Sequence, residues 1–102
     1  MLKLQPKPTF KAKVAIPIPG GKPAQVEFEF NALTRTDLQQ YLTDSEGRSD
    51  SDNLSEIVCG WSGVDTPFSS EALSQLLDNY VGAARAILDK FIEELTKARA
   101  GN

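Results

Sequence analysis

The side chains that most often catalyse reactions are scarce in this sequence. It contains no histidine and one cysteine, Cys59, which removes Ser-His and Cys-His nucleophile pairs and most zinc sites. No base lies near Cys59 in the sequence, so we expect it to be a core residue rather than a nucleophile. The stretch Gly60-Trp61-Ser62-Gly63 fails the G-x-S-x-G pattern of a nucleophile elbow. We therefore predict no catalytic residues and a protein that is not an enzyme.

Two polar stretches resemble ligand-binding loops but fail at essential positions. Gly20-Gly21-Lys22-Pro23 is similar to the end of a P-loop, yet its first glycine is wrongly spaced and Pro23 replaces the metal-binding Ser or Thr. A calcium loop that begins at Asp44 would place Arg48 at a ligand position. We therefore predict no cofactor and no bound metal, and we interpret residues 43–52 as a solvated polar loop.

The basic residues of this chain are concentrated at one end. The 102 residues carry a net charge of −3, but residues 1–24 contain no acid and hold Lys3, Lys7, Lys11, Lys13 and Lys22. Such a segment can contact phosphates. A solvated arm followed by lysines on a strand is the simpler interpretation, because the rest of the chain is acidic.

Length and composition favour one domain of the cytoplasm. A chain of 102 residues can bury one modest core. It has a single cysteine and no apolar run close to the roughly 18 residues of a membrane span. We predict a flexible arm over residues 1–8 and a single α+β domain over residues 9–102, with a hairpin at 9–30 and a helical region at 35–100.

Two runs of alternating residues predict a β-hairpin around Pro19-Gly20-Gly21. When residues whose numbers add to 40 are paired, apolar residues lie opposite each other on one face of the hairpin and lysines lie opposite glutamates on the other. A slip of one residue would place lysine opposite phenylalanine. The predicted apolar pairs are Val14 with Val26, Ala12 with Phe28 and Phe10 with Phe30; the charged pairs are Lys13 with Glu27 and Lys11 with Glu29.

The remaining sequence is mostly helical in pattern. Residues 36–42 predict a short helix capped by Thr34 or Thr36, and residues 54–61 are apolar without favouring helix or strand. Ser69 is a predicted N-cap. An apolar stripe then runs from residue 73 to 95, as one kinked helix or two helices, and Gly101 is a predicted stop.

Large apolar side chains outside the hairpin are candidates for contact with another protein. Trp61 and Phe68 either cover the core beneath the polar loop or anchor a partner, since tryptophan is enriched at binding hot spots. The far end of the helical stripe is either core or surface left for another chain. An open-edged hairpin and a long stripe predict a homo-oligomer. The candidate partner-binding residues are Trp61, Phe68, Tyr80, Leu88, Phe91 and Leu95.

The order of these features resembles one family of proteins. The hairpin with Ile16-Pro17-Ile18-Pro19 is followed by Gly60-Trp61, then by Pro67-Phe68-Ser69, and finally by Ala98-Arg99-Ala100-Gly101-Asn102. Over roughly residues 9–102 this is similar to the small tail assembly chaperones of long-tailed bacteriophages and prophages. Together, the Gly-Trp to Pro-Phe-Ser stretch and the final Ala-Arg-x-Gly-Asn carry the resemblance.

The resemblance implies a function in virion assembly. Proteins of this kind bind the aggregation-prone tape measure protein in the cytoplasm of the bacterial host, before the tail tube polymerises around it. A longer form made by translational frameshifting recruits the tail tube protein. The resemblance thus implies a chaperone that is absent from the finished virion, without nucleic-acid or membrane partners. The alternative from the residues alone is a small nucleic-acid-contacting regulator, similar to an antitoxin, that uses its basic arm.

Overall fold

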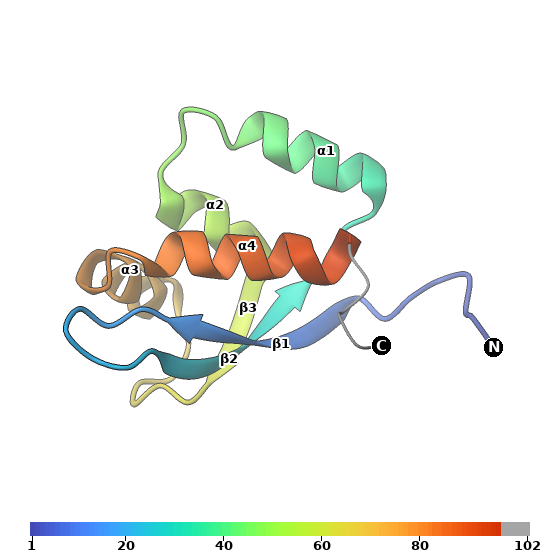
Figure 1. The fold of residues 1–102 in the computed structure, drawn as a ribbon. Helices are drawn as coiled ribbons and strands as arrows, with labels where there is room; N and C mark the ends of the chain where they lie inside the picture. Colours follow the sequence, from blue (N-terminus) through green and yellow to red (C-terminus); the bar gives the residue numbers. More distant parts are fainter. Residues whose placement is uncertain (97–102) are drawn as a thin grey trace.

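The computed structural model describes residues 1–96 as an α+β fold. Figure 1 shows the helices gathered on one side of a three-stranded antiparallel sheet, with α4 running along it. The expected Ala-Arg-x-Gly-Asn ending and the stop at Gly101 lie outside the described residues. In chain order the elements are β1 (Thr9–Ile16), β2 (Ala24–Asn31), α1 (Arg35–Asp44), α2 (Asp50–Ile57), β3 (Val58–Ser62), α3 (Ser70–Asn79) and α4 (Ala83–Thr96).

The hairpin pairs in the register that the sequence predicts. β1 and β2 are antiparallel, with Val14 opposite Val26, Phe10 opposite Phe30 and Lys13 opposite Glu27. Apolar residues of both strands therefore point to the helices, and lysines and glutamates point to the other face. The alternation of the sequence is strong enough to fix this register, because a slip would exchange the two faces.

A third strand extends the hairpin, which the sequence did not predict. Residues 54–61, left open between helix and strand, are in fact both: α2 ends at Ile57 and β3 pairs with β2 from Val58. The ladder is interrupted by a bulge, because Glu29 lies opposite Gly60 but Phe30 lies opposite Val58. One outer edge of the hairpin is thereby covered.

The bulge also corrects the expectation for Cys59. Cys59 is the extra residue between Gly60 and Val58, and its side chain is exposed rather than part of the core. Its Sγ lies 3.5 Å from the carbonyl oxygen of Glu29. Partial desolvation raises the pKa of this thiol, and the charge of Glu29 raises it further. The thiol therefore stays protonated at neutral pH and is a poor nucleophile.

Much of the predicted polar loop is helical, so the loop at residues 43–52 is shorter than expected. α1 continues to Asp44, and α2 begins at Asp50 because the Ser49 side chain accepts a hydrogen bond from the Asp52 backbone N–H at 3.1 Å. Thr34, one of the two predicted caps, caps α1 by accepting from the Asp37 N–H.

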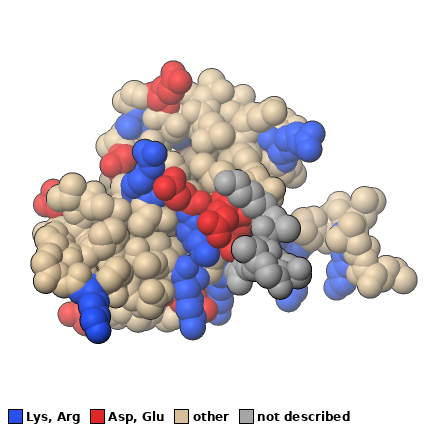
Figure 2. Space-filling view, in the orientation of Figure 1, with Lys and Arg blue, Asp and Glu red and all other residues tan. Residues whose placement is uncertain are grey.

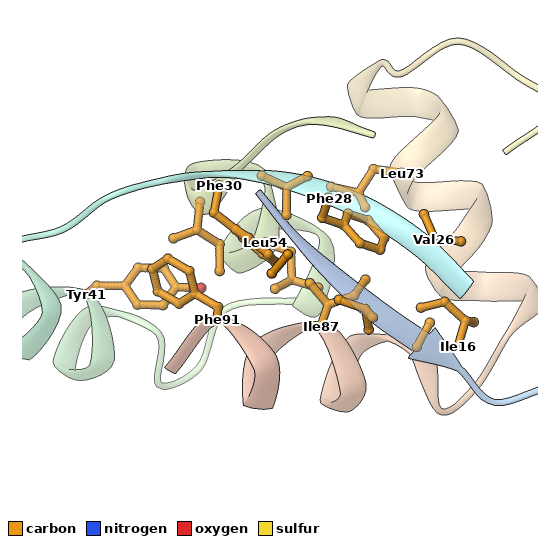
Figure 3. Packing of buried hydrophobic residues seen from close by; sticks show 14 residues of the cluster. Ile16, Val26, Phe28, Phe30, Tyr41, Leu54, Leu73, Ile87 and Phe91 are labelled. Atoms are coloured by element: carbon orange, nitrogen blue, oxygen red, sulfur yellow. The ribbon is translucent and has the colours of Figure 1, made fainter. Parts of the chain in front are cut away.

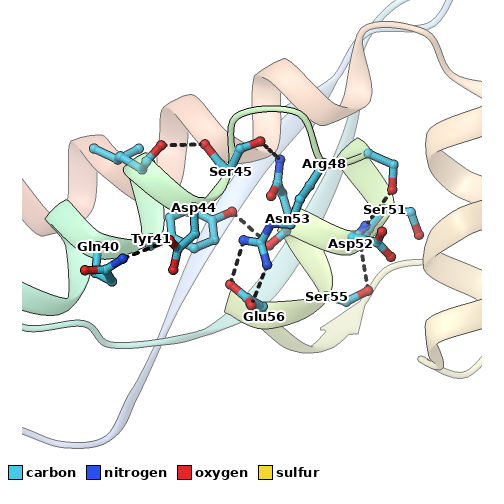
Figure 4. Close-up of polar contacts among 12 residues, drawn as sticks. Gln40, Tyr41, Asp44, Ser45, Arg48, Ser51, Asp52, Asn53, Ser55 and Glu56 are labelled. Carbon is cyan, nitrogen blue, oxygen red and sulfur yellow. Dashed lines mark hydrogen bonds and ion pairs between the residues drawn. The ribbon is translucent and has the colours of Figure 1, made fainter.

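A polar network joins α1 to α2 (Figure 4). The Tyr41 hydroxyl donates to the Asn53 carbonyl oxygen at 2.8 Å, and both terminal nitrogens of Arg48 reach Glu56, at 2.9 and 3.1 Å. Burial, aided by the charge of Glu56, raises the pKa of Tyr41 to about 12. Tyr41 therefore stays neutral under ordinary conditions and acts as a donor that fixes α1.

The apolar stripe over residues 73–95 is two helices, which settles the alternative left by the sequence. Ser69 caps α3 by accepting from the Ala72 N–H at 3.0 Å, and α3 ends at Asn79. α4 starts at Ala83 after a short turn. Gly82 lies in this turn, where a Cβ would be 3.0 Å from Cγ of Pro17. A larger residue at this position would press on the Pro17 ring, so the turn and the hairpin loop approach closely at this glycine.

The core lies between the sheet and the helices (Figure 3). Phe91 of α4 is fully buried, with ring centroids 5.3 Å from Phe30, 6.0 Å from Phe10 and 6.4 Å from Tyr41. Ile87, one turn earlier on α4, is also fully buried. The middle of α4 therefore covers the apolar face of the sheet.

Candidate partner-binding groove

A groove opens at the end of the molecule that carries the hairpin turn and α3. It has a volume of about 330 Å³, which is at the lower end for pockets that bind ligands. The ends of all three strands, the loop after β3 and one side of α3 form its walls. Its lining includes Ile18, Trp61, Val64, Gln75, Leu76 and Tyr80.

Trp61 is held rigidly at the wall of this groove. Its ring packs edge-on against Phe28, with centroids 6.2 Å apart, and against Phe68, with centroids 5.2 Å apart. Its Nε1–H donates to the Thr66 carbonyl oxygen at 2.8 Å. The indole is nevertheless only half-buried. An aromatic side chain fixed on one side and open on the other is suited to bind an apolar group without losing much conformational freedom.

The loop after β3 is shaped by a glycine. Gly63 has φ of +94°, and a Cβ at this position would lie 3.2 Å from the carbonyl oxygen of Gln25. Any other residue would be strained by its backbone conformation and would also press against β2. Gly63 thus lets the chain turn closely over β2, so that Val64 and Thr66 form the rim of the groove.

The opposite wall is the end of α3 and the turn that follows it. Tyr80 terminates the helix, its N–H donating to the Leu76 carbonyl oxygen at 3.0 Å and its own carbonyl oxygen accepting from Ala83 at 2.9 Å. Val81 follows directly, and 88% of its surface is exposed. An aliphatic side chain in water next to half-buried Tyr80 extends the apolar surface beyond the groove itself.

The structure brings together part of the predicted partner-binding set. Trp61 and Tyr80 both line the groove, and Phe68 supports Trp61 from behind. Leu88, Phe91 and Leu95 do not line it: Leu88 and Leu95 are half-buried on α4 against the core. Phe91 is fully buried in the monomer, so this structure does not offer it to a partner.

Several groove residues were missed by the sequence analysis. Ile18 continues the alternation of the first predicted strand, and Val64 stands alone in a loop, so neither pattern indicates a groove. Val81, just beyond the groove, was not singled out either. The apolar residues beside the turns could have drawn attention to this end of the molecule. Which of them share one groove depends on β3, which the sequence did not predict.

The rest of the described chain offers no competing site for chemistry. Among residues 1–96, no three His, Cys, Asp or Glu side chains are grouped so that they could hold a metal ion. No described helix is long and apolar enough to cross a membrane. A second, smaller hollow lies over Gly60 on the polar face of the sheet, between Lys11, Glu27 and Glu29.

Two of the five lysines of the basic segment lie opposite acids across the hairpin. Lys11 lies opposite Glu29 and Lys13 lies opposite Glu27 in the hairpin. Figure 2 shows blue and red side chains interspersed over the visible face of the body, without a broad area of one sign. This arrangement does not favour the phosphate-binding strand that a nucleic-acid-contacting regulator would use.

A small α+β domain with a groove that holds two half-exposed aromatic side chains, and without a cluster of catalytic side chains in its described part, is suited to bind protein. The comparison with protein families agrees: a family model described as phage tail assembly chaperone matches residues 1–102. The chain belongs to the phage tail assembly chaperone family, whose members assist assembly without catalysis. No curated protein and no solved structure matches the chain.

Proposed function

We propose that this chaperone binds the tape measure protein by taking apolar side chains of a helical segment into the groove between α3 and β3. The observation that carries the proposal is the pair Trp61 and Tyr80, two aromatic side chains that line one groove and remain partly exposed. Exposed aromatic groups that are held by the fold are the usual anchors of protein interfaces.

The groove is matched to part of a helix rather than to a whole one. Since an engineered cavity of about 150 Å³ holds a benzene molecule, the 330 Å³ of this groove hold about two side chains of leucine size. Neighbouring apolar residues on one helix face, three or four positions apart, would fit. Such a contact is modest alone, so a long partner would be covered by several copies of the chaperone.

The function in assembly follows from this mode of binding. Copies bound along the tape measure protein in the cytoplasm of the bacterial host keep its apolar helices from aggregating. They leave as the tail tube closes around it, so that they are absent from the virion. A longer frameshifted form would add the contact to the tail tube protein.

The test is co-expression of the chaperone with the tape measure protein, followed by measurement of how much tape measure protein remains soluble. Gln75 lines the groove and is exposed, so Gln75→Arg should block the groove and leave the fold intact. Gln39→Arg makes the same chemical change on the exposed surface of α1 and serves as the control. We expect loss of soluble tape measure protein with Gln75→Arg alone. Equal solubility with both variants would refute the groove as the binding site.

A further inference from the structure

The arm formed by residues 1–8 carries apolar side chains that no part of the described monomer, residues 1–96, covers. Met1, Leu2 and Leu4 are exposed at 121%, 95% and 99%. Figure 1 shows this arm leaving the body at the end opposite to α3, where the groove lies. Exposed apolar residues grouped within a few positions of one segment indicate a surface that is buried in another state.

We propose that the arm of one copy binds in the groove of a second copy. Leu2 and Leu4 would take the place beside Trp61, Leu76 and Tyr80 that a tape measure helix takes in the proposed function. The occupant is thus a segment of this same chain, and the arm interaction can be tested without the tape measure protein.

Charge supports this pairing of arm and groove. The arm has Lys3 and Lys7 and no acid, and in Figure 2 the segment that projects from the body shows blue without red. The loop and helix that form one side of the groove, residues 63–80, contain three acids and no lysine or arginine: Asp65, Glu71 and Asp78. Asp65 lines the groove itself. Attraction between the two segments favours docking of this arm over docking of an acidic one.

The arm cannot place Leu4 in the groove of its own chain. The Ala32 N–H donates to the Pro8 carbonyl oxygen at 2.9 Å, which holds Pro8 at the start of β1. From Pro8, a fully extended chain reaches Leu4 within about 14 Å. β1 alone, which separates Pro8 from the groove residue Ile16, is about 23 Å long. A copy that gives its arm at one end and accepts an arm at the other associates head to tail, which produces rings or filaments.

Site-specific cross-linking tests the contact in the full chain. All variants carry Cys59→Ser, so that only introduced thiols react. Chains with Leu4→Cys are mixed with chains with Gln75→Cys, in the groove, and separately with chains with Gln39→Cys, on exposed α1. A short bismaleimide is then added. We expect dimers cross-linked between copies in the first mixture and few in the second. Equal yields in both mixtures, or no cross-link in either, would overturn the proposal.

Sedimentation equilibrium provides the second arm of the test. Leu4→Asp should weaken self-association about tenfold or more, because a buried leucine is replaced by a charge. Gln5→Asp adds the same charge at the neighbouring position of the arm and should weaken self-association less. If the two variants associate as the parent does, the arm is not the contact. A groove that cross-links to the arm but never binds tape measure protein would leave this inference standing and remove the proposed function.

Discussion

The two ends of this domain use aromatic residues in opposite ways. At the end where α1 meets α4, the rings of Phe30, Phe91 and Tyr41 pack on one another and are withdrawn from water. At the end with α3, the rings of Trp61 and Tyr80 stand on the walls of a groove and remain half-exposed. Aromatic content is therefore not what distinguishes the core from the proposed binding surface. The two ends differ because α4 covers the aromatic residues of the sheet at one end, whereas no described helix covers the groove at the other.

Substitutions at the two ends should differ most in their effect on the free energy of unfolding. Phe91→Ala should lower the free energy of unfolding by about 3–5 kcal/mol, a large part of the total for a domain of this size. Val81→Ala, at an exposed position of the groove end, should change it by less than about 0.5 kcal/mol. Urea denaturation followed by circular dichroism measures both. A Phe91→Ala protein that unfolds at the parent's urea concentration would contradict the assignment of Phe91 to the core.

A smaller effect is expected at the glycine that shapes the groove rim. Gly63→Ala combines a backbone conformation at positive φ with a contact of 3.2 Å to Gln25, so we expect a loss of about 1–3 kcal/mol. Gly47 also has positive φ, +80°, but nothing lies near its Cβ position. Gly47→Ala should therefore lower the free energy of unfolding by only about 1 kcal/mol, which is the cost of placing alanine at positive φ. Equal losses in thermal unfolding would mean that the contact with β2 is unimportant.

The cap of α3 should contribute about as much as a single cap usually does. Ser69→Ala removes the acceptor of the Ala72 N–H and should cost about 1 kcal/mol. Ser70→Ala, one residue later and inside the helix, is the matched control and should cost little. Hydrogen exchange of α3 amides would show whether the loss is local. Faster exchange in both variants would argue against the assigned cap.

The smallest effect is a dependence of stability on pH. The hydrogen bond from Arg48 lowers the pKa of Glu56 below its ordinary value. A lowered folded-state pKa stabilises the protein above the unfolded pKa, and this contribution is lost as the pH falls through the folded value. Arg48→Met should therefore lower the urea midpoint at pH 7 and change it less at pH 3. Arg85→Met removes a more exposed partner, that of Asp89, as a control. An equal shift of the midpoint at both pH values would contradict the ion-pair account.

Sequence reasoning succeeded where local pattern decides structure. The hairpin register, the Ser69 cap and the α+β class were all predicted correctly, because alternation and capping are properties of neighbouring residues. It failed at β3, whose five residues are too short for a clear alternation and contain a bulge. That failure also misplaced Cys59, since the bulge turns its side chain outward.

The candidate site was predictable only in part for the same reason. Trp61 and Tyr80 were singled out as large apolar residues, and both line the groove. Their meeting place depends on tertiary structure, since they come from β3 and from the end of α3. Phe91 has the same apolar character in the sequence, yet the sheet that covers it lies far away along the chain.

The fluorescence of Trp61 shows whether the tape measure protein binds in the groove. Trp61 is the single tryptophan of the chain and stands in the groove wall, so its emission reports on that groove. Titration with a tryptophan-free variant of the tape measure protein should shift the emission to shorter wavelength, and Gln75→Arg should abolish the shift. Saturable binding of the tape measure protein with no change in Trp61 emission would show that the partner binds elsewhere and would contradict the account.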